Sequence, residues 1–215
     1  MSKISDRRKN ARDAGATDYE RKRREIIQAA ATVFKEQSLG NATMDEIAKR
    51  AGLDRASLYY YFKGKRELFR DMVSVATNDN VEMAEAIAAS EDTADSKLRR
   101  LIIGLFESYE RHYPYLYVYL QEDMNQLPQD NSAWSRKVMD LNHRFDTAVH
   151  SIVQQGFESG ELVSKGSPKL IAAGVLGMCN WSHRWYRPNS LNTAQEIAEV
   201  FSALVLNGLC RAPKN

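Results

Sequence analysis

The 215-residue sequence is 43% hydrophobic and has a formal net charge of +2, a composition typical of an ordinary globular protein. No stretch approaches 18 uninterrupted apolar residues, and the polar, basic amino terminus lacks the apolar segment of a secretion signal. We therefore expect a cytoplasmic protein with no membrane partner. Its two cysteines, Cys179 and Cys210, lie in apolar helical patterns and are expected to be buried thiols.

Charge is distributed unevenly along the chain. Residues 1–70 contain 17 Lys and Arg against 10 Asp and Glu, a net charge of +7, which leaves −5 for residues 71–215. A charge run is often only a solvated face. A basic segment joined to an acidic one nevertheless indicates a polyanion as a candidate partner.

The first predicted helix runs from Asp18 to Gln37. Its apolar residues recur at helical spacing on one face, and Gly40 follows as a stop signal. Residues 43–46 read Thr-Met-Asp-Glu, a capping box that predicts a short second helix ending at Gly52.

Asp54 is placed to cap a third helix that starts at Arg55. Residues 43–62 then form a helix, a tight glycine turn and a second helix, which is the spacing of a helix-turn-helix. In that motif the amino-terminal residues of the second helix reach base edges in the major groove of DNA.

The third helix carries residue types that suit DNA contacts. Arg55 can make a bidentate contact to guanine, Ala56 can lie against a thymine methyl, and Ser57 can reach a base or a phosphate. Consecutive helical residues are about 100° apart, so the three tyrosines at 59–61 cannot all share one buried face, although packing remains an alternative for each alone. Leu58 and Phe62 are expected to point into the core.

The rest of the chain is helical in pattern, which predicts an all-α fold of about nine helices. The sixth segment, residues 113–120, alternates like a strand, but no partner strand is apparent, so we predict a helix with Pro114 in its first turn. Its aromatic residues would be buried or line a cavity. The other predicted helices open at or near Leu68, Leu98, Trp134, Pro168 and Thr193, and the eighth is expected to run to about Trp185.

The stretch AATVFKEQSLGNATMDEIAKRAGLDRASLYYYFKGKRELF resembles the DNA-binding domain of the TetR/AcrR family of bacterial transcriptional regulators. The resemblance covers about residues 20–70, with Leu53 in place of a more usual Val. It implies a homodimer on a palindromic double-stranded DNA operator, released by a small-molecule effector in a larger carboxy-terminal domain. The DNA-binding residues that it implies are Thr43, Arg55, Ala56, Ser57, Tyr59, Tyr60, Tyr61 and Lys65.

Three regions follow from this resemblance. Residues 1–18 are expected to form a basic flexible arm, residues 19–66 the helix-turn-helix domain, and residues 67–215 the ligand-binding and dimerisation domain. The arm is a candidate for nonspecific phosphate or minor-groove contacts, and the alternative is a solubilising tail. The eighth and ninth predicted helices are candidates for a four-helix dimer interface, and the alternative is ordinary packing within the chain. The small residues that suggest the interface are Ala172, Ala173, Gly174 and Gly177.

The stretch LGMCNWSHRWYRP is similar to a subgroup that regulates fatty-acid and steroid catabolism and responds to acyl-CoA thioesters. That similarity implies aromatics around the acyl part and arginines on the CoA phosphates. The alternative is a tryptophan-rich dimer core with cations at a helix carboxy terminus. The ligand-binding candidates, including the tyrosine run, are Phe106, Tyr109, Tyr113, Tyr117, Met124, Trp181, Arg184, Trp185 and Arg187.

No motif for an enzyme or a bound cofactor is present. The sequence lacks a P-loop, a dinucleotide-binding glycine turn, a nucleophile elbow and a paired histidine spacing for zinc. Three alternatives to an acyl-CoA-responsive repressor remain open. They are a regulator of another hydrophobic or aromatic compound, a DNA-binding protein without an effector, and a helical protein-interaction module.

Overall fold

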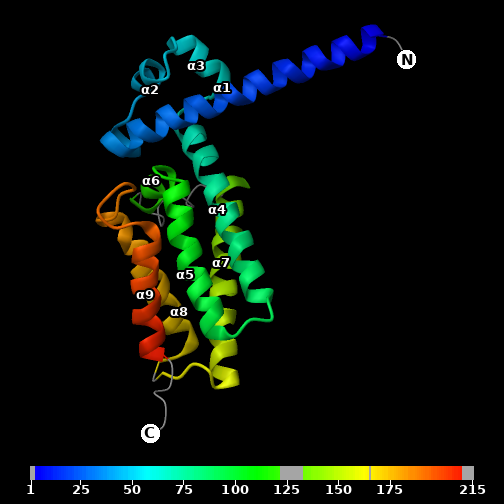
Figure 1. Ribbon diagram of the computed structural model, residues 1–215. Coiled ribbons are helices and arrows are strands. Elements are labelled where there is room, and N and C mark those ends of the chain that lie inside the picture. The colour runs from blue at the N-terminus through cyan, green and yellow to red at the C-terminus, as the bar shows by residue number, and fades with distance from the viewer. Residues whose placement is uncertain (1–2, 122–132, 165, 210–215) are drawn as a thin grey trace. The chain divides into compact units, whose positions relative to one another are not determined.

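The computed structural model describes the backbone of residues 3–121, 133–164 and 166–209, with side chains from residue 17 onward (Figure 1). Within these residues the chain forms nine α-helices, one short 3-10 helix and no strand, which confirms the all-α prediction. Two compact units divide the chain, Met1–Met72 and Val73–Asn215. None of the helices described is both long enough and apolar enough to cross a membrane.

The first unit contains α1 (Lys3–Asn41), α2 (Met44–Arg50), α3 (Arg55–Tyr61) and the start of α4 (Lys65–Ala89). The helical backbone of α1 begins well before Asp18 and includes residues expected to form the arm. Residues 3–17 contain no proline and several good helix formers, so the helix continues although the core-facing apolar pattern starts later. The arm and the domain boundaries stay predictions.

The backbone conformation that interrupts α1 near its carboxy-terminal end lies at Ser38 and not at Gly40, where the sequence predicted it. Ser38 has φ 69° and ψ 160° and interrupts the helical backbone, whereas Gly40, the expected stop, has no positive φ. A backbone conformation reserved almost entirely for glycine is therefore held by a serine at this turn.

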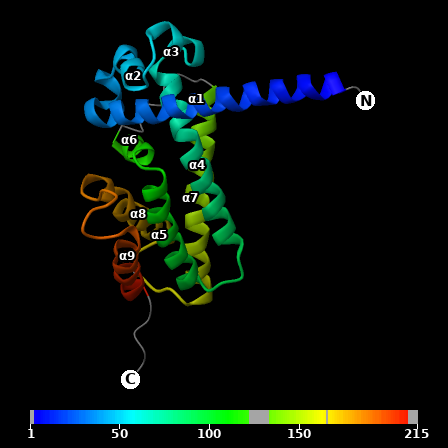
Figure 2. The ribbon, with the colours of Figure 1, turned by 45° about the horizontal axis from the view of Figure 1, so that its top comes forward.

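The second unit is a helical bundle built around α5. Besides the rest of α4 it contains α5 (Ala94–Arg111), α6 (Tyr115–Gln121), α7 (Ala133–Ser159), α8 (Pro168–Trp181), a 3-10 turn (Ser182–Arg184) and α9 (Ala194–Leu209). In both ribbon views α5 lies between α9 and α7, and α7 also packs against α8 (Figures 1 and 2).

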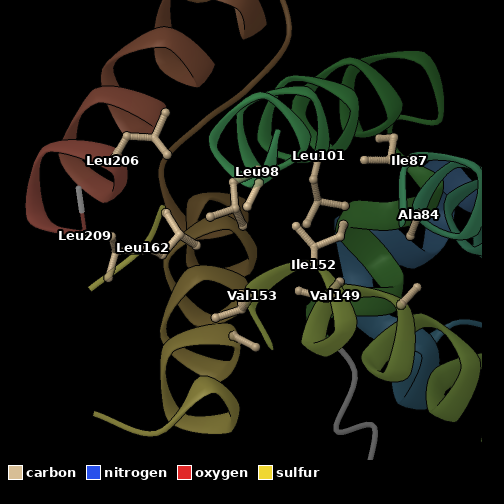
Figure 3. Packing of buried hydrophobic residues seen from close by; sticks show 13 residues of the cluster. Ala84, Ile87, Leu98, Leu101, Val149, Ile152, Val153, Leu162, Leu206 and Leu209 are labelled. Carbon is tan, nitrogen blue, oxygen red and sulfur yellow. The ribbon is translucent and has the colours of Figure 1, made fainter. Parts of the chain in front are cut away.

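The core of this bundle is formed by aliphatic side chains from five helices and the loop after α7. Figure 3 shows them meeting, with Leu98 and Leu101 of α5 between Leu206 of α9 and Ile152 of α7. Lys97 is only 1% exposed beside this core, and its ammonium donates hydrogen bonds to Ala88 O at 3.0 Å and Gln155 Oε1 at 2.7 Å. Those bonds compensate for the buried charge.

Several helix boundaries follow from local chemistry that the sequence displays. Ser167 caps α8 ahead of Pro168, and Gly160, with φ +76°, follows the end of α7. α8 ends at Trp181 rather than near Trp185, because a 3-10 turn follows it, so the two tryptophans do not share one helix face. α6 begins at Tyr115, directly after Pro114, so proline precedes the first turn.

Candidate nucleic-acid interface and ligand cavity

Three local hydrogen-bond motifs fix the two ends of α2 and the start of α3. The Thr43 hydroxyl accepts from Glu46 N while the Glu46 carboxylate accepts from Thr43 N, which confirms the capping box. At the other end of α2, Gly52 has φ +66° and Leu53 N donates to Ala48 O at 2.9 Å, the pattern of a Schellman motif. Asp54 then caps α3, as predicted.

α3 has one buried and one exposed face. Leu58 and Phe62 are buried, as predicted. Arg55 and Ala56 at the start of the helix are exposed, and so are Tyr59 and Tyr60 one turn later, with Tyr60 73% exposed. The residues proposed to read bases therefore lie on the open side of the helix, while the DNA contacts themselves stay predictions.

The three tyrosines occupy different environments. Tyr61 is half-buried and stacks on Tyr19 of α1 with ring centroids 5.1 Å apart, and Tyr60 meets both rings edge-on. Tyr59 is 42% exposed and lies under the Arg55 guanidinium, 5.6 Å from ring centroid to Cζ. Tyr59 and Tyr60 thus lie on the outer surface, whereas Tyr61 packs against α1.

Two polar side chains of the exposed face already have partners within the protein. Arg55 Nη1 lies 3.2 Å from the Asp45 carboxylate, with both side chains exposed. Ser57 donates its backbone N–H to Asp54 Oδ1 and its hydroxyl to Asp54 Oδ2, both at 2.8 Å. These bonds from Ser57, backbone first, lower the pKa of the Asp54 carboxyl.

Lys65 has a structural contact that its sequence position did not reveal. Its ammonium donates to Gly40 O at 2.6 Å and Ala42 O at 3.0 Å, and so binds the turn between α1 and α2. Exposed cations nearby are Lys63 and Arg66, which were not among the predicted DNA contacts. The lysines around Gly64 were the available signal for Lys63.

The second unit contains a largely apolar cavity of about 240 Å³. Phe106 and Tyr109 line it, as the sequence analysis proposed, whereas Tyr113 and Tyr117 are absent from its wall and form a chain of ring contacts beside Tyr109. Wall residues that were not predicted come from α4, α5, α6, α7, α8 and the turn after α8, and include Thr77, Asn80, Val81, Leu105, Leu116, Tyr119, Leu120, Asn142, Phe145, Asp146, Leu176, Cys179, Asn180 and Ser182.

Burial changes the acidity of several groups in this wall. It raises the pKa of Tyr109, an effect that the positive charge of Arg187 partly opposes. Burial also raises the pKa of Tyr119 to about 12, the pKa of Cys179 to about 12, and the pKa of the Asp146 carboxyl. These phenols and the thiol are neutral at physiological pH.

A basic hollow of about 350 Å³ adjoins the cavity, because Leu120 lines both. Tyr117, Trp181, Arg184 and Arg187 are among its wall residues. The two guanidiniums lie over rings, Arg184 over Trp181 at 4.8 Å and Arg187 over Tyr117 at 4.4 Å. Within the described residues neither arginine has a carboxylate partner.

Two residues predicted to bind the ligand, Trp185 and Met124, are not among the described wall residues of the cavity or the basic hollow. Trp185 lies outside both the cavity and the basic hollow and packs near Phe201, with ring centroids 6.2 Å apart. Met124 lies outside the described residues, as does Cys210. The side chains that are described bring together no group of three His, Cys, Asp or Glu that could hold a metal ion.

An exposed apolar stripe runs along α8 and α9. Leu170, Gly174, Gly177 and Trp181 recur at helical spacing on α8, and a Cβ added to either glycine would meet nothing within 4 Å. On α9, Val200 and Leu204 are 58% and 63% exposed. Ala173 is also exposed, whereas Ala172 is buried.

An exposed helix-turn-helix recognition helix, in one chain with a helical unit that holds a ligand-sized cavity, defines a DNA-binding regulator. Family comparison agrees. Residues 26–72 match the model described as bacterial regulatory proteins, tetR family, and residues 91–209 match the Tetracyclin repressor-like, C-terminal domain. The chain therefore belongs to the TetR family, whose members are transcriptional regulators and not enzymes.

Individual relatives extend along most of the chain. The HTH-type transcriptional repressor KstR2 of Mycobacterium tuberculosis is 26% identical over 199 residues, which covers 93% of this chain and 98% of the relative. The solved structure of that ketosteroid regulator superposes with a TM-score of 0.81 over 88% of this chain and 95% of the other. The TetR family regulator PfmR from Thermus thermophilus is 29% identical, with a TM-score of 0.75 over 86% and 99%.

A third solved structure shows likeness of fold alone. AibR, determined in complex with isovaleryl coenzyme A and operator DNA, is 17% identical and superposes with a TM-score of 0.73 over 87% of this chain and 99% of the other. The similarity to regulators of steroid catabolism, inferred from the sequence, is supported by KstR2.

Proposed function

We propose that this protein is a transcriptional repressor that binds a palindromic operator as a homodimer and releases it when an apolar small molecule occupies the cavity. Acyl-CoA thioesters are the first candidates for that effector. The observation that carries the proposal is the adjacency of an apolar cavity and a basic hollow, which share Leu120. A repressor of this kind acts on the chromosome, which places the protein in the cytoplasm.

DNA recognition is proposed for the exposed face of α3. Arg55 and Ala56 would read bases, while Thr43, Tyr59 and Tyr60 would contact the backbone. Tyr61 and Lys65, which are engaged with Tyr19 and with the α1–α2 turn, would contribute at the edge of the interface. The exposed position of Arg55 and Ala56 supports this assignment.

Selection from a random pool of DNA duplexes tests the proposed recognition, followed by fluorescence anisotropy on the enriched sequence. Arg55→Ala is expected to lose about tenfold or more in discrimination between the selected site and single-base variants. Arg99→Ala, an exposed arginine on α5, is the matched control and should leave that discrimination unchanged. Enrichment of no sequence, or equal discrimination by Arg55→Ala, would refute a base-reading role.

Dimerisation is proposed through the exposed stripe on α8 and α9. Glycines at 174 and 177 permit close approach of a second helix, and Val200 and Leu204 supply apolar area that is exposed in the single chain. A twofold dimer presents two copies of α3, which is the geometry that a palindrome matches.

The acyl-CoA assignment is supported by the chemistry of the two adjoining spaces. An acyl chain suits the apolar cavity, and the exposed guanidinium of Arg184 and the half-buried one of Arg187 suit phosphate groups. AibR provides a precedent for coenzyme A binding on this fold, since its structure was solved with isovaleryl coenzyme A.

Thermal unfolding in the presence of CoA thioesters, matching free acids and unrelated aromatic compounds tests the effector class. A ligand at about 100 times its dissociation constant stabilises by about 2.7 kcal/mol, which raises Tm by several degrees. The double variant Arg184→Gln with Arg187→Gln should lose the response to thioesters, and Arg99→Gln should keep it. A response to free acids or aromatic compounds alone would refute the CoA assignment.

The second candidate is a regulator of a hydrophobic compound without a CoA group. It is favoured by the contacts of Arg187, whose Nη1 donates to His183 O and Tyr186 O at 2.7 Å each and so has a structural role. The net charge of −5 over residues 71–215 also opposes a polyphosphate ligand. The thermal-unfolding experiment separates the two candidate functions. If no compound raises Tm, the result favours a repressor that has no effector.

A further inference from the structure

Two polar atoms of the cavity wall have no hydrogen-bond partner among the residues that the structure describes. They are the Tyr109 hydroxyl oxygen and Asn80 Oδ1, both fully buried, and the Tyr109 side chain as a whole is only 4% exposed. Two other hydroxyls in the same wall are hydrogen-bonded within the protein. The Tyr119 hydroxyl donates to Asn142 Oδ1 at 3.3 Å, and the Thr77 hydroxyl donates to Val73 O at 3.0 Å.

A buried polar atom without a partner is destabilising, and a protein interior rarely retains one without a use for it. Phenylalanine in place of Tyr109 would fill the same space without that cost. A tyrosine and an asparagine in the wall of one cavity are therefore best explained by a ligand that supplies the missing hydrogen bonds.

The charge of the wall restricts the ligand further. Among the wall residues that the structure describes, Asp146 is the one carboxylic acid, and none is a Lys, Arg or His. A carboxylate inside the cavity would have no cation in the wall to pair with and would meet Asp146, while Arg187, whose charge acts on Tyr109, lines the basic hollow instead. The group that reaches Tyr109 and Asn80 must then be uncharged.

We propose that the cavity selects an apolar molecule that bears a neutral oxygen group, a hydroxyl or a ketone, which Tyr109 and Asn80 hold inside the protein. A ketone oxygen would accept from the Tyr109 hydroxyl, and a ligand hydroxyl would donate to Asn80 Oδ1 or pair with Tyr109. A plain hydrocarbon body would leave both atoms unpaired. This inference rests on the proposed function insofar as it takes the cavity to be the effector site.

Three probes of nearly equal size test it: the bicyclic hydrocarbon decalin, its ketone decalone and its alcohol decalol. Binding is measured by the rise in Tm and by calorimetry on the full-length protein. We expect the two oxygenated probes to bind about tenfold more tightly than decalin, because each supplies a hydrogen bond to an otherwise unpaired group.

Tyr109→Phe should erase the preference for decalone without weakening the binding of decalin. Tyr119→Phe is the matched control, since it removes a hydroxyl from the same wall whose partner is Asn142. That control should keep the preference. Asn80→Leu should reduce the preference for decalol over decalin.

A second readout needs no ligand. Tyr109→Phe should leave Tm unchanged or raise it, because the hydroxyl that it removes is unpaired, whereas Tyr119→Phe should lower Tm. A lower Tm for Tyr109→Phe would show that the hydroxyl has a structural partner and would overturn the inference.

The outcomes separate this inference from the proposed function. If decalin binds as tightly as decalone and decalol, the selectivity for oxygen is refuted while the cavity remains an effector site. If none of the three binds but CoA thioesters raise Tm, the proposed function stands and this inference fails. If neither set of compounds has an effect, both are overturned.

Discussion

Ser57 donates its hydroxyl proton to Asp54 Oδ2 at 2.8 Å, so on the exposed face of α3 its oxygen offers only lone pairs. A phosphate also offers only lone pairs, whereas adenine N6 and cytosine N4 present N–H groups in the major groove. The cap of α3 thus favours Ser57 as a reader of a base amino group over a phosphate contact.

Ser57→Ala is accordingly expected to reduce the preference for adenine or cytosine at one operator position by roughly two- to tenfold. Anisotropy titrations against all single-base variants of the selected operator measure this. An equal loss of affinity on every sequence would instead indicate a phosphate contact.

The same aspartate predicts a pH dependence of stability. Folding lowers the pKa of the Asp54 carboxyl below its ordinary value of 3.8. The ionised carboxylate therefore stabilises the folded protein fully above pH 3.8, and this stabilisation is lost as the pH falls through the pKa of the folded state. Asp54→Asn keeps an oxygen that can cap α3 but does not titrate. Urea unfolding should show similar stability of the two proteins near pH 7 and a smaller loss for the variant in acid; equal losses would contradict the prediction.

The backbone at Ser38 predicts a stabilising substitution. Its φ of 69° with ψ of 160° is nearly exclusive to glycine, so Ser38→Gly should raise the free energy of unfolding by about 1–3 kcal/mol. Gly52→Ala, at φ +66°, should lower it by about 1–2 kcal/mol. Gly64→Ala, where φ is not positive and an added Cβ has open space, serves as the control in the same urea titrations.

Lys65 and Lys63 are expected to respond differently to removal of their charge. Lys65→Met loses both hydrogen bonds to the α1–α2 turn, so it should lower stability by about 1 kcal/mol and also weaken DNA binding. Lys63→Met removes an exposed cation and should weaken DNA binding alone, with a fall of about 1 in the slope of log affinity against log salt. Unchanged stability of Lys65→Met would contradict a structural role for its ammonium.

The stripe on α8 and α9 predicts the effect of a charge at the proposed dimer interface. Leu204→Glu should shift the mass measured by light scattering from dimer towards monomer and weaken binding to a palindromic operator. Glu199→Gln, an exposed change on α9 outside the stripe, should leave the mass unchanged. A wild-type protein that is monomeric at micromolar concentration would refute the dimer itself.

Local features of this fold could be predicted from the sequence, whereas long-range contacts could not. The capping box and the aspartate cap depend on residues three apart, and the buried positions of Leu58 and Phe62 follow from helical spacing. The pairing of Tyr61 with Tyr19 and the engagement of Lys65 with Gly40 join residues far apart in sequence, so no local pattern announces them.

The cavity shows the same division. Phe106 and Tyr109 stand out as aromatics on one helix, but Asn80, Leu120 and Asn142 come from three other helices and become neighbours only through packing. The tyrosine run suggested a continuous lining, yet Tyr117 faces the basic hollow instead. The aromatic residues in the sequence predicted a pocket, but which of them line it depends on the tertiary packing of the helices.

Cys179 in the cavity wall gives the protein an internal reporter of occupancy. Burial raises the pKa of its thiol to about 12, so almost none is thiolate at neutral pH and its reaction with maleimides is slow. An effector that fills the cavity would slow it further, which turns alkylation rate into a measure of ligand binding. In a Cys210→Ser background, the remaining cysteine would report on the cavity alone.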